Sequence, residues 1–173
     1  MDEHVAAIYE MNQDVWKRLE DALADLADEE IDWRPVPESN SINDIVRHLR
    51  IEAEWHSNSL RDGTPMPTIA APVSRDAVDA IPLNFRANLA ALTGHQARYL
   101  ANLHASTLED LKNRTSMAYQ NAARGRNYVI AYHHAVHLAT HCGQIRMLRN
   151  LYRTTKGKPA LFVPTNPTYP ARQ

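Results

Sequence analysis

The sequence contains a single cysteine and carries almost no net charge, and both shortages exclude classes of protein. One cysteine in 173 residues excludes an intramolecular disulfide framework and a multi-cysteine zinc site. Lys and Arg total 19 against 20 Asp and Glu, giving a formal net charge of -1 and no overall positive field for nucleic acid or an anionic membrane. We therefore expect a protein with neither partner, in the reducing environment of the cytoplasm.

Long apolar runs and glycine-rich motifs are also missing. No stretch of about 18 apolar residues is present, and the beginning of the chain lacks a basic segment followed by an apolar one. With only 5 glycines, the chain has no phosphate-binding loop and no dinucleotide fingerprint. It also lacks the repeated Glu-x-x-His units of di-iron bundles.

The apolar pattern predicts an all-α protein. Apolar residues recur at three- and four-residue spacings in four long segments, and we found no run in which apolar and polar residues alternate. The long helices are expected at about 4–27, 41–63, 83–104 and 124–153, with short helical turns within 74–80 and 107–112. Four long amphipathic helices in one domain predict a four-helix bundle.

Proline divides the chain. Of 10 prolines, four stand at positions 65, 67, 72 and 82, and four more between residue 159 and the end. Because proline breaks helices, residues 64–82 are expected to form a long crossover between the second and third helices. We expect residues 1–155 to form the bundle domain and 156–173 to form a proline-rich tail on it or extending from it.

Nine histidines contrast with the lone cysteine, and four of them lie between residues 133 and 141. His137 and His141 are four residues apart, which places both imidazoles on one face of a helix where they can share a metal ion. The spacing alone is a weak signal in a chain rich in histidine. His133 and His134 lie near the same face, so either could replace a proposed ligand.

His48 is the third candidate ligand. It lies in the middle of the second expected helix, on the side of Ile45 and Leu49, and should face the bundle interior. A lone histidine in such a place is more often a core residue, but three imidazoles with an open position are typical of a catalytic metal site. Such ligands suit zinc, nickel, copper or iron alike. The remaining histidines are expected at the surface or its boundary: His4, His56, His95 and His104.

Two further polar residues are candidates for a catalytic role. Glu52 follows His48 by one helical turn and could orient a ligand or accept a proton, although a solvent-facing helix glutamate is the simpler interpretation. Gln144 follows His141 by three residues and could form a hydrogen bond with a ligand or substrate. Cys142 is expected to be a small buried side chain rather than a nucleophile.

Three segments together resemble the DinB-like superfamily. They are Glu-Ile-Asp-Trp-Arg-Pro-Val-Pro at 30–37, Asn-Ser-Ile-Asn-Asp-Ile-Val-Arg-His-Leu at 40–49, and His-x-x-x-His-Cys-Gly-Gln-Ile at 137–145. The resemblance implies an up-up-down-down bundle, often a homodimer, with a divalent metal, zinc or nickel, held by His48, His137 and His141. Cys142 departs from the pattern, because many relatives have arginine there.

The resemblance also implies an activity. Members of this superfamily with known activity transfer or isomerise with a low-molecular-weight thiol, which serves as cosubstrate and is activated by the metal. We therefore expect the thiol, or a water, to attack a small electrophilic substrate. A metal-dependent hydrolase, a non-catalytic metal-binding or dimerising bundle, and a purely structural domain remain the alternatives. The sequence does not identify the thiol, the electrophile or the metal.

Overall fold

The computed structural model describes residues 1–62, 74–113 and 127–163. Four long helices dominate: α1 (Glu3–Leu23), α3 (Ile42–Asp62), α5 (Phe85–Ala105) and α7 (Asn127–Thr155). Three short ones lie between them: α2 (Asp28–Ile31), α4 (Arg75–Asp79) and α6 (Leu108–Asn113). These three ranges contain no strand, so the prediction of an all-α fold with four long helices is confirmed.

The predicted helix boundaries hold to within a few residues except at the end of α1. The pattern predicted a helix to residue 27, whereas α1 ends at Leu23. Ala24 is extended, and Asp25 adopts a φ of 51°, in the left-handed region that a right-handed helix cannot include. The short turns expected within 74–80 and 107–112 are α4 and α6. Of the proline-rich crossover predicted over residues 64–82, residues 64–73 lie outside the described residues.

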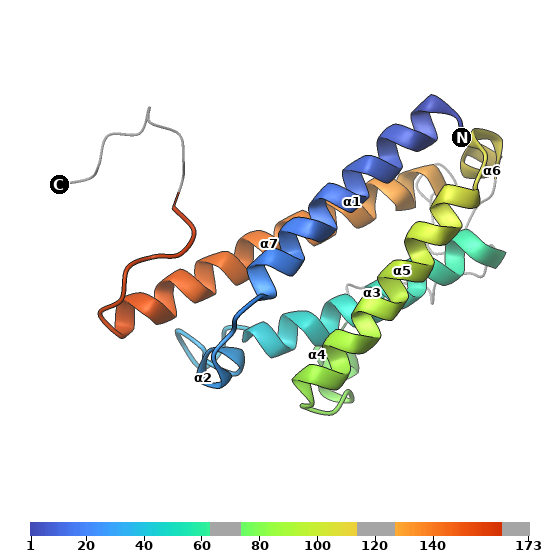
Figure 1. Cartoon of the computed structure of the whole chain (residues 1–173). Coiled ribbons are helices and arrows are strands. Elements are labelled where there is room, and N and C mark those ends of the chain that lie inside the picture. The colour runs from blue at the N-terminus through green and yellow to red at the C-terminus, as the bar shows by residue number, and fades with distance from the viewer. Residues whose placement is uncertain (63–73, 114–126, 164–173) are drawn as a thin grey trace.

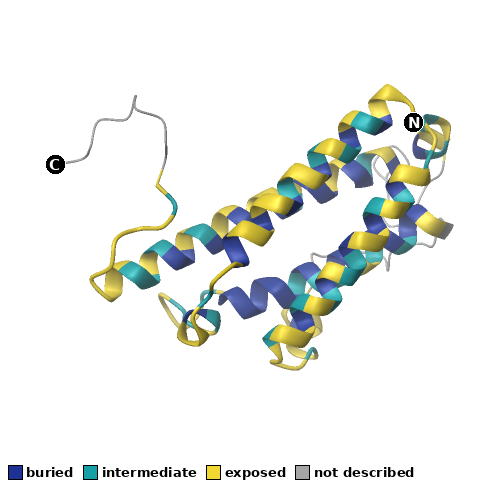
Figure 2. Cartoon of the chain, in the orientation of Figure 1, coloured by how far each residue is buried: buried dark blue, intermediate teal, exposed yellow. Residues whose placement is uncertain are grey.

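The long helices are arranged in two pairs (Figure 1). α1 lies along α7, α3 lies along α5, and the two pairs face each other. Figure 2 shows that the buried surfaces of these helices are turned inward and the exposed surfaces outward. No helix in the described ranges is long and apolar enough to cross a membrane. The contact between α3 and α7 brings the predicted ligands together.

The start of α3 is fixed by hydrogen bonds and ion pairs. Ser41 Oγ accepts from the Asp44 amide, and Asp44 Oδ2 accepts from the Ser41 amide at 2.8 Å, so each residue caps the other. Arg34 and Arg47 both pair with the buried Asp44 carboxylate. Arg47 also donates to the carbonyls of Val78 and Ile81, which ties α4 to α3. These contacts fix the turn that precedes His48.

A layer of polar side chains crosses the bundle between two apolar clusters. Each long helix contributes one member that is at most 1% exposed: Asn12, His56, Gln96 and His134. The layer has apolar neighbours on both sides along each helix, namely Ile8 and Trp16, Ala53 and Leu60, Leu92 and Tyr99, and Ala131 and Leu138. Polar groups at such depth require hydrogen bonds. His134 bonds to both His56 and Gln96, and Asn12 bonds to backbone carbonyls of α1 and α7.

Candidate metal centre

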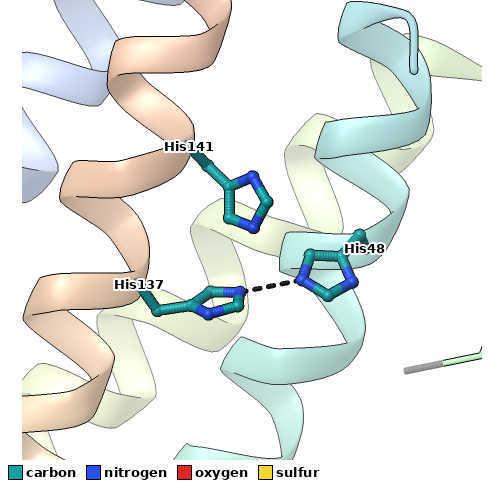
Figure 3. Close-up of side chains that lie close together, drawn as sticks. All are labelled: His48, His137 and His141. Atoms are coloured by element: carbon teal, nitrogen blue, oxygen red, sulfur yellow. Dashed lines mark hydrogen bonds between the residues drawn. The ribbon is translucent and has the colours of Figure 1, made fainter. Parts of the chain in front are cut away.

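His48 of α3 and His137 and His141 of α7 point toward one another (Figure 3). The Nε2 atoms of His48 and His137 are 2.8 Å apart. The ring centroid of His141 is 4.8 Å from that of His48 and 4.6 Å from that of His137. One nitrogen of each ring lies within 4.8 Å of the others. The structure therefore brings together the three residues selected from the sequence as metal ligands.

The local sequence accounts for this convergence. Four-residue spacing stacks His137 and His141 one turn apart on the face of α7 that meets α3. His48 follows the capped first turn of α3, and its neighbours Ile45 and Leu49 are buried in the first apolar cluster. All three imidazoles are half-buried, so they are held by the core yet remain accessible on one side.

Gln144 fixes the protonation of His141. Its Oε1 lies 2.7 Å from His141 Nδ1. An amide oxygen can only accept, so Nδ1 of the neutral imidazole carries the hydrogen and Nε2 keeps a free lone pair. Histidine ligands of metals are commonly held in this way by a hydrogen-bond acceptor behind the ring. Gln144 thus holds the His141 ring through this hydrogen bond.

Burial keeps these imidazoles neutral. Loss of solvent lowers the pKa of His48 to about 4, with a further contribution from His141. The pKa of His137 is lowered further, first by burial and then by the surrounding imidazoles. Burial also lowers the pKa of His141, against the opposing hydrogen bond to Gln144. At neutral pH the rings offer lone pairs rather than positive charge, as a metal requires.

A pocket opens beside the centre. It has a volume of about 270 Å³, and His48 and His141 form part of its wall. Asn40, Asp44 and Arg75 supply the polar part of the wall, and Ile45 and Val78 the apolar part. Arg75 Nη1 donates to Asn40 Oδ1 at 3.0 Å, so these two polar lining residues hold each other in place. The pocket can admit a small polar molecule to the nitrogens of His48 and His141.

Glu52 and His56 are not members of the three-histidine group, and two expectations about them were wrong. Glu52 is 6% exposed, so it is not a solvent-facing glutamate, and His56 is 0% exposed rather than at the surface. Both face inward because α5 and α7 cover this part of α3. They form a second group with His133, in which one oxygen or nitrogen of each lies within 4.8 Å of the others. The signal was present in the sequence: His48, Glu52 and His56 follow at four-residue spacing and form one stripe.

The other histidines are distributed as their helix faces dictate. His134 is 1% exposed and turns away from the centre toward the polar layer. His133 belongs to the second group and adjoins the first, with ring centroids 5.8 Å from His56 and 5.5 Å from His137. His4 and His104 are exposed and His95 is at the boundary, as expected. Neither His133 nor His134 takes the place of a member of the three-histidine group.

Cys142 is buried, as expected, and its Sγ donates to the Arg18 carbonyl at 3.4 Å. Burial raises the pKa of this thiol, which keeps it protonated and unreactive at neutral pH. The lone cysteine therefore packs α7 against α1 and supplies no nucleophile. Sulfur chemistry at this centre would require a thiol from outside the chain.

Comparison with known families agrees with the site. The family described as Mycothiol-S-transferase matches residues 9–154, which include all four long helices except the ends of α1 and α7. No curated protein and no solved structure gave a significant match. The family match covers most of the chain and all three histidines of the centre. The chain thus belongs to the mycothiol-S-transferase family, within the DinB/YfiT-like superfamily.

Proposed function

We propose that this protein is a divalent-metal-dependent S-transferase that uses a low-molecular-weight thiol of the mycothiol type. The observation that carries the proposal is the convergence of three neutral imidazoles, two of which, His48 and His141, line an open pocket. Family membership supports the thiol as cosubstrate. A small electrophile is the second substrate. Two findings thus support the proposal: the donor set fits a metal, and the family is one of S-transferases.

The residues present fit a divalent transition metal. Three imidazole nitrogens from two helices suit zinc or nickel, and the pocket leaves the fourth side open. His141 is already in the tautomer that presents Nε2, since Gln144 holds its Nδ1 hydrogen. When bound, the metal would lower the pKa of a coordinated thiol and so maintain the reactive thiolate at neutral pH.

The chain's own side chains would hold the metal, exclude water and contact the two substrates. His48, His137 and His141 stay uncharged and therefore do not repel a cation. Gln144 orients His141, and the buried faces of α3 and α7 exclude water from the side opposite the pocket. Asn40 and Arg75 offer an amide and a guanidinium to the polar part of the thiol or the electrophile. In the reaction, a carbon–sulfur bond forms and the leaving group of the electrophile departs with the electron pair.

We propose the up-up-down-down connectivity, a homodimer and a cytoplasmic location, all of which are consistent with the family. A face for the homodimer is available on α7, where Tyr128, Tyr132, Val136, Met147 and Leu151 are each at least 41% exposed. An exposed apolar stripe of this length is typical of a protein interface.

The test combines metal content with thiol transfer. Protein stripped of metal with a chelator should show only the uncatalysed rate of conjugation between the thiol and monobromobimane, and one equivalent of Zn²⁺ or Ni²⁺ at the centre should restore turnover. His137→Ala should reduce metal affinity and turnover by roughly 100-fold or more, because it removes a direct ligand. His104→Gln, an exposed histidine on α5, is the control and should change neither. Turnover that persists unchanged in the His137→Ala protein would refute the proposal.

A further inference from the structure

A second group of metal-binding side chains lies beside the three-histidine centre on the same pair of helices. Glu52 and His56 come from α3 and His133 from α7, and their ligand atoms lie within 4.8 Å of one another. His133 and His137 are one helical turn apart, so the second group extends the first along the contact between α3 and α7. Nothing in the proposed transferase reaction uses these three residues.

The hydrogen bonds behind His56 determine which of its nitrogens is free. Gln96 Oε1 lies 2.7 Å from His134 Nε2 and can only accept, so His134 donates from Nε2. The Nδ1 of neutral His134 is then an acceptor. It lies 2.8 Å from His56 Nδ1, which must therefore donate. The Nε2 atom of His56 is left with an unshared lone pair.

That lone pair has no hydrogen-bond partner. His56 Nε2 is a buried nitrogen with none in the structure, although the residue is 0% exposed. It faces the Glu52 carboxylate, with Nε2 and Oε2 3.7 Å apart. When the Glu52 carboxyl is ionised, two acceptors face each other at this depth, and no donor of the described residues satisfies His56 Nε2. A cation between them would satisfy both.

We propose that Glu52, His56 and His133 form a second divalent transition-metal site, separate from the three-histidine centre. Two imidazoles and one carboxylate are a donor set used by zinc enzymes and by non-haem iron proteins. Calcium and magnesium favour all-oxygen sites, so they fit less well. His133 is the exposed member, and it provides the side from which an ion can enter.

The surrounding structure prepares this site as it prepares the first. His134 and Gln96 hold His56 from behind, in the way that Gln144 holds His141. The carboxylate makes the second site formally more negative than the first, which has imidazoles only. The inference stands on these contacts, and it does not depend on whether the protein transfers thiols.

Metal stoichiometry tests the proposal. Chelator-treated protein titrated with Co²⁺, with binding followed by equilibrium dialysis and visible absorption, should take up two equivalents. His133→Gln and, separately, Glu52→Gln should each take up one. His137→Ala should also take up one equivalent, bound at the second site. The double variant His137→Ala, His133→Gln should bind no ion tightly. Wild-type protein that saturates at one equivalent would overturn the proposal.

Controls separate the site from general effects of substitution. Glu54→Gln changes an exposed glutamate of the same helix, and His104→Gln an exposed histidine of α5; both should keep two equivalents. His133 is exposed, so His133→Gln should fold even if Glu52→Gln does not. If His133→Gln folds and still binds two equivalents, the assignment is wrong whatever the activity of the protein.

Discussion

His48 and His137 form a hydrogen bond through their Nε2 atoms, which are 2.8 Å apart. One of these two neutral rings must therefore carry its hydrogen on Nε2, the atom that faces the centre. A metal held by both rings needs both lone pairs. Binding should thus break this hydrogen bond and move the hydrogen of the donor ring to its Nδ1.

The first prediction is this change of tautomer. Long-range ¹H–¹⁵N spectra of the metal-free protein at pH 7 should show one of the two rings protonated at Nε2. After addition of Zn²⁺, both rings should be protonated at Nδ1 only. Spectra that do not change on saturation with zinc would mean that these rings are not ligands.

The second prediction concerns Gln144. Replacement by Ala removes the acceptor behind His141, and we expect metal affinity at the three-histidine centre to fall by roughly 10- to 100-fold. Competition with a chromogenic chelator measures the change. Gln144→Glu keeps an oxygen acceptor at the same position and should retain affinity near that of the wild type. Equal losses of metal affinity in Gln144→Ala and Gln144→Glu would show that the oxygen acceptor behind His141 does not determine the affinity.

The third prediction uses the buried carboxyl of Glu52. Burial raises its pKa from 4.5 to about 7, so in the metal-free folded protein it stays protonated to a higher pH than in the unfolded chain. Its favourable contribution is complete below pH 4.5 and is lost as the pH rises through 7. Relative to wild type, metal-free Glu52→Gln should therefore gain roughly 2 to 3 kcal/mol in unfolding free energy between pH 4.5 and 8.

Urea denaturation in the presence of a chelator at pH 4.5 and 8 measures this difference. The buried and half-buried histidines of the two groups and the polar layer have lowered pKa values, so they reduce the stability of the protein as the pH falls below about 6.5. This loss is the same in both proteins and cancels in the comparison. The same difference at both pH values would contradict the prediction. With Co²⁺ at saturation, Glu52→Gln should instead be less stable than the wild type at pH 8, since the variant lacks a metal ligand.

The fourth prediction concerns the start of α3. Asp44 is 2% exposed and pairs with Arg34 and Arg47, so Asp44→Asn leaves the buried Arg47 guanidinium with only the exposed Asp79 carboxylate, 3.6 Å away, as counter-charge. Removal of one partner from such a pair costs about 3 kcal/mol or more, which urea denaturation will detect. Asp14→Asn breaks the exposed pair with Arg18 and should cost less than about 1 kcal/mol.

The long helices and the three-histidine group could be predicted from the sequence because each depends on local spacing. His137 and His141 share a face whatever α7 packs against, and buried Ile45 and Leu49 indicate the inward side of α3. The break at Asp25 has no apolar signal, since it arises from a backbone conformation. The four-residue spacing from His48 and Glu52 puts His56 on the same side of α3, but the depth of its burial depends on how α5 and α7 cover the second half of that helix. That arrangement comes from tertiary packing, which the sequence pattern does not encode.

The polar layer of Asn12, His56, Gln96 and His134 has a consequence for the centre as a whole. If α3 slid by one turn against α7, about 5 Å, His56 would lose His134 and several buried polar groups would be left unsatisfied. The apolar clusters alone tolerate such a shift far better, because one leucine contact can replace another. The layer therefore selects a single alignment of the helices, as a buried asparagine does in a coiled coil. His48 is therefore held opposite His137 and His141 before a metal ion binds. The entropy lost in bringing the three side chains together is lost when the bundle folds, not when the ion binds.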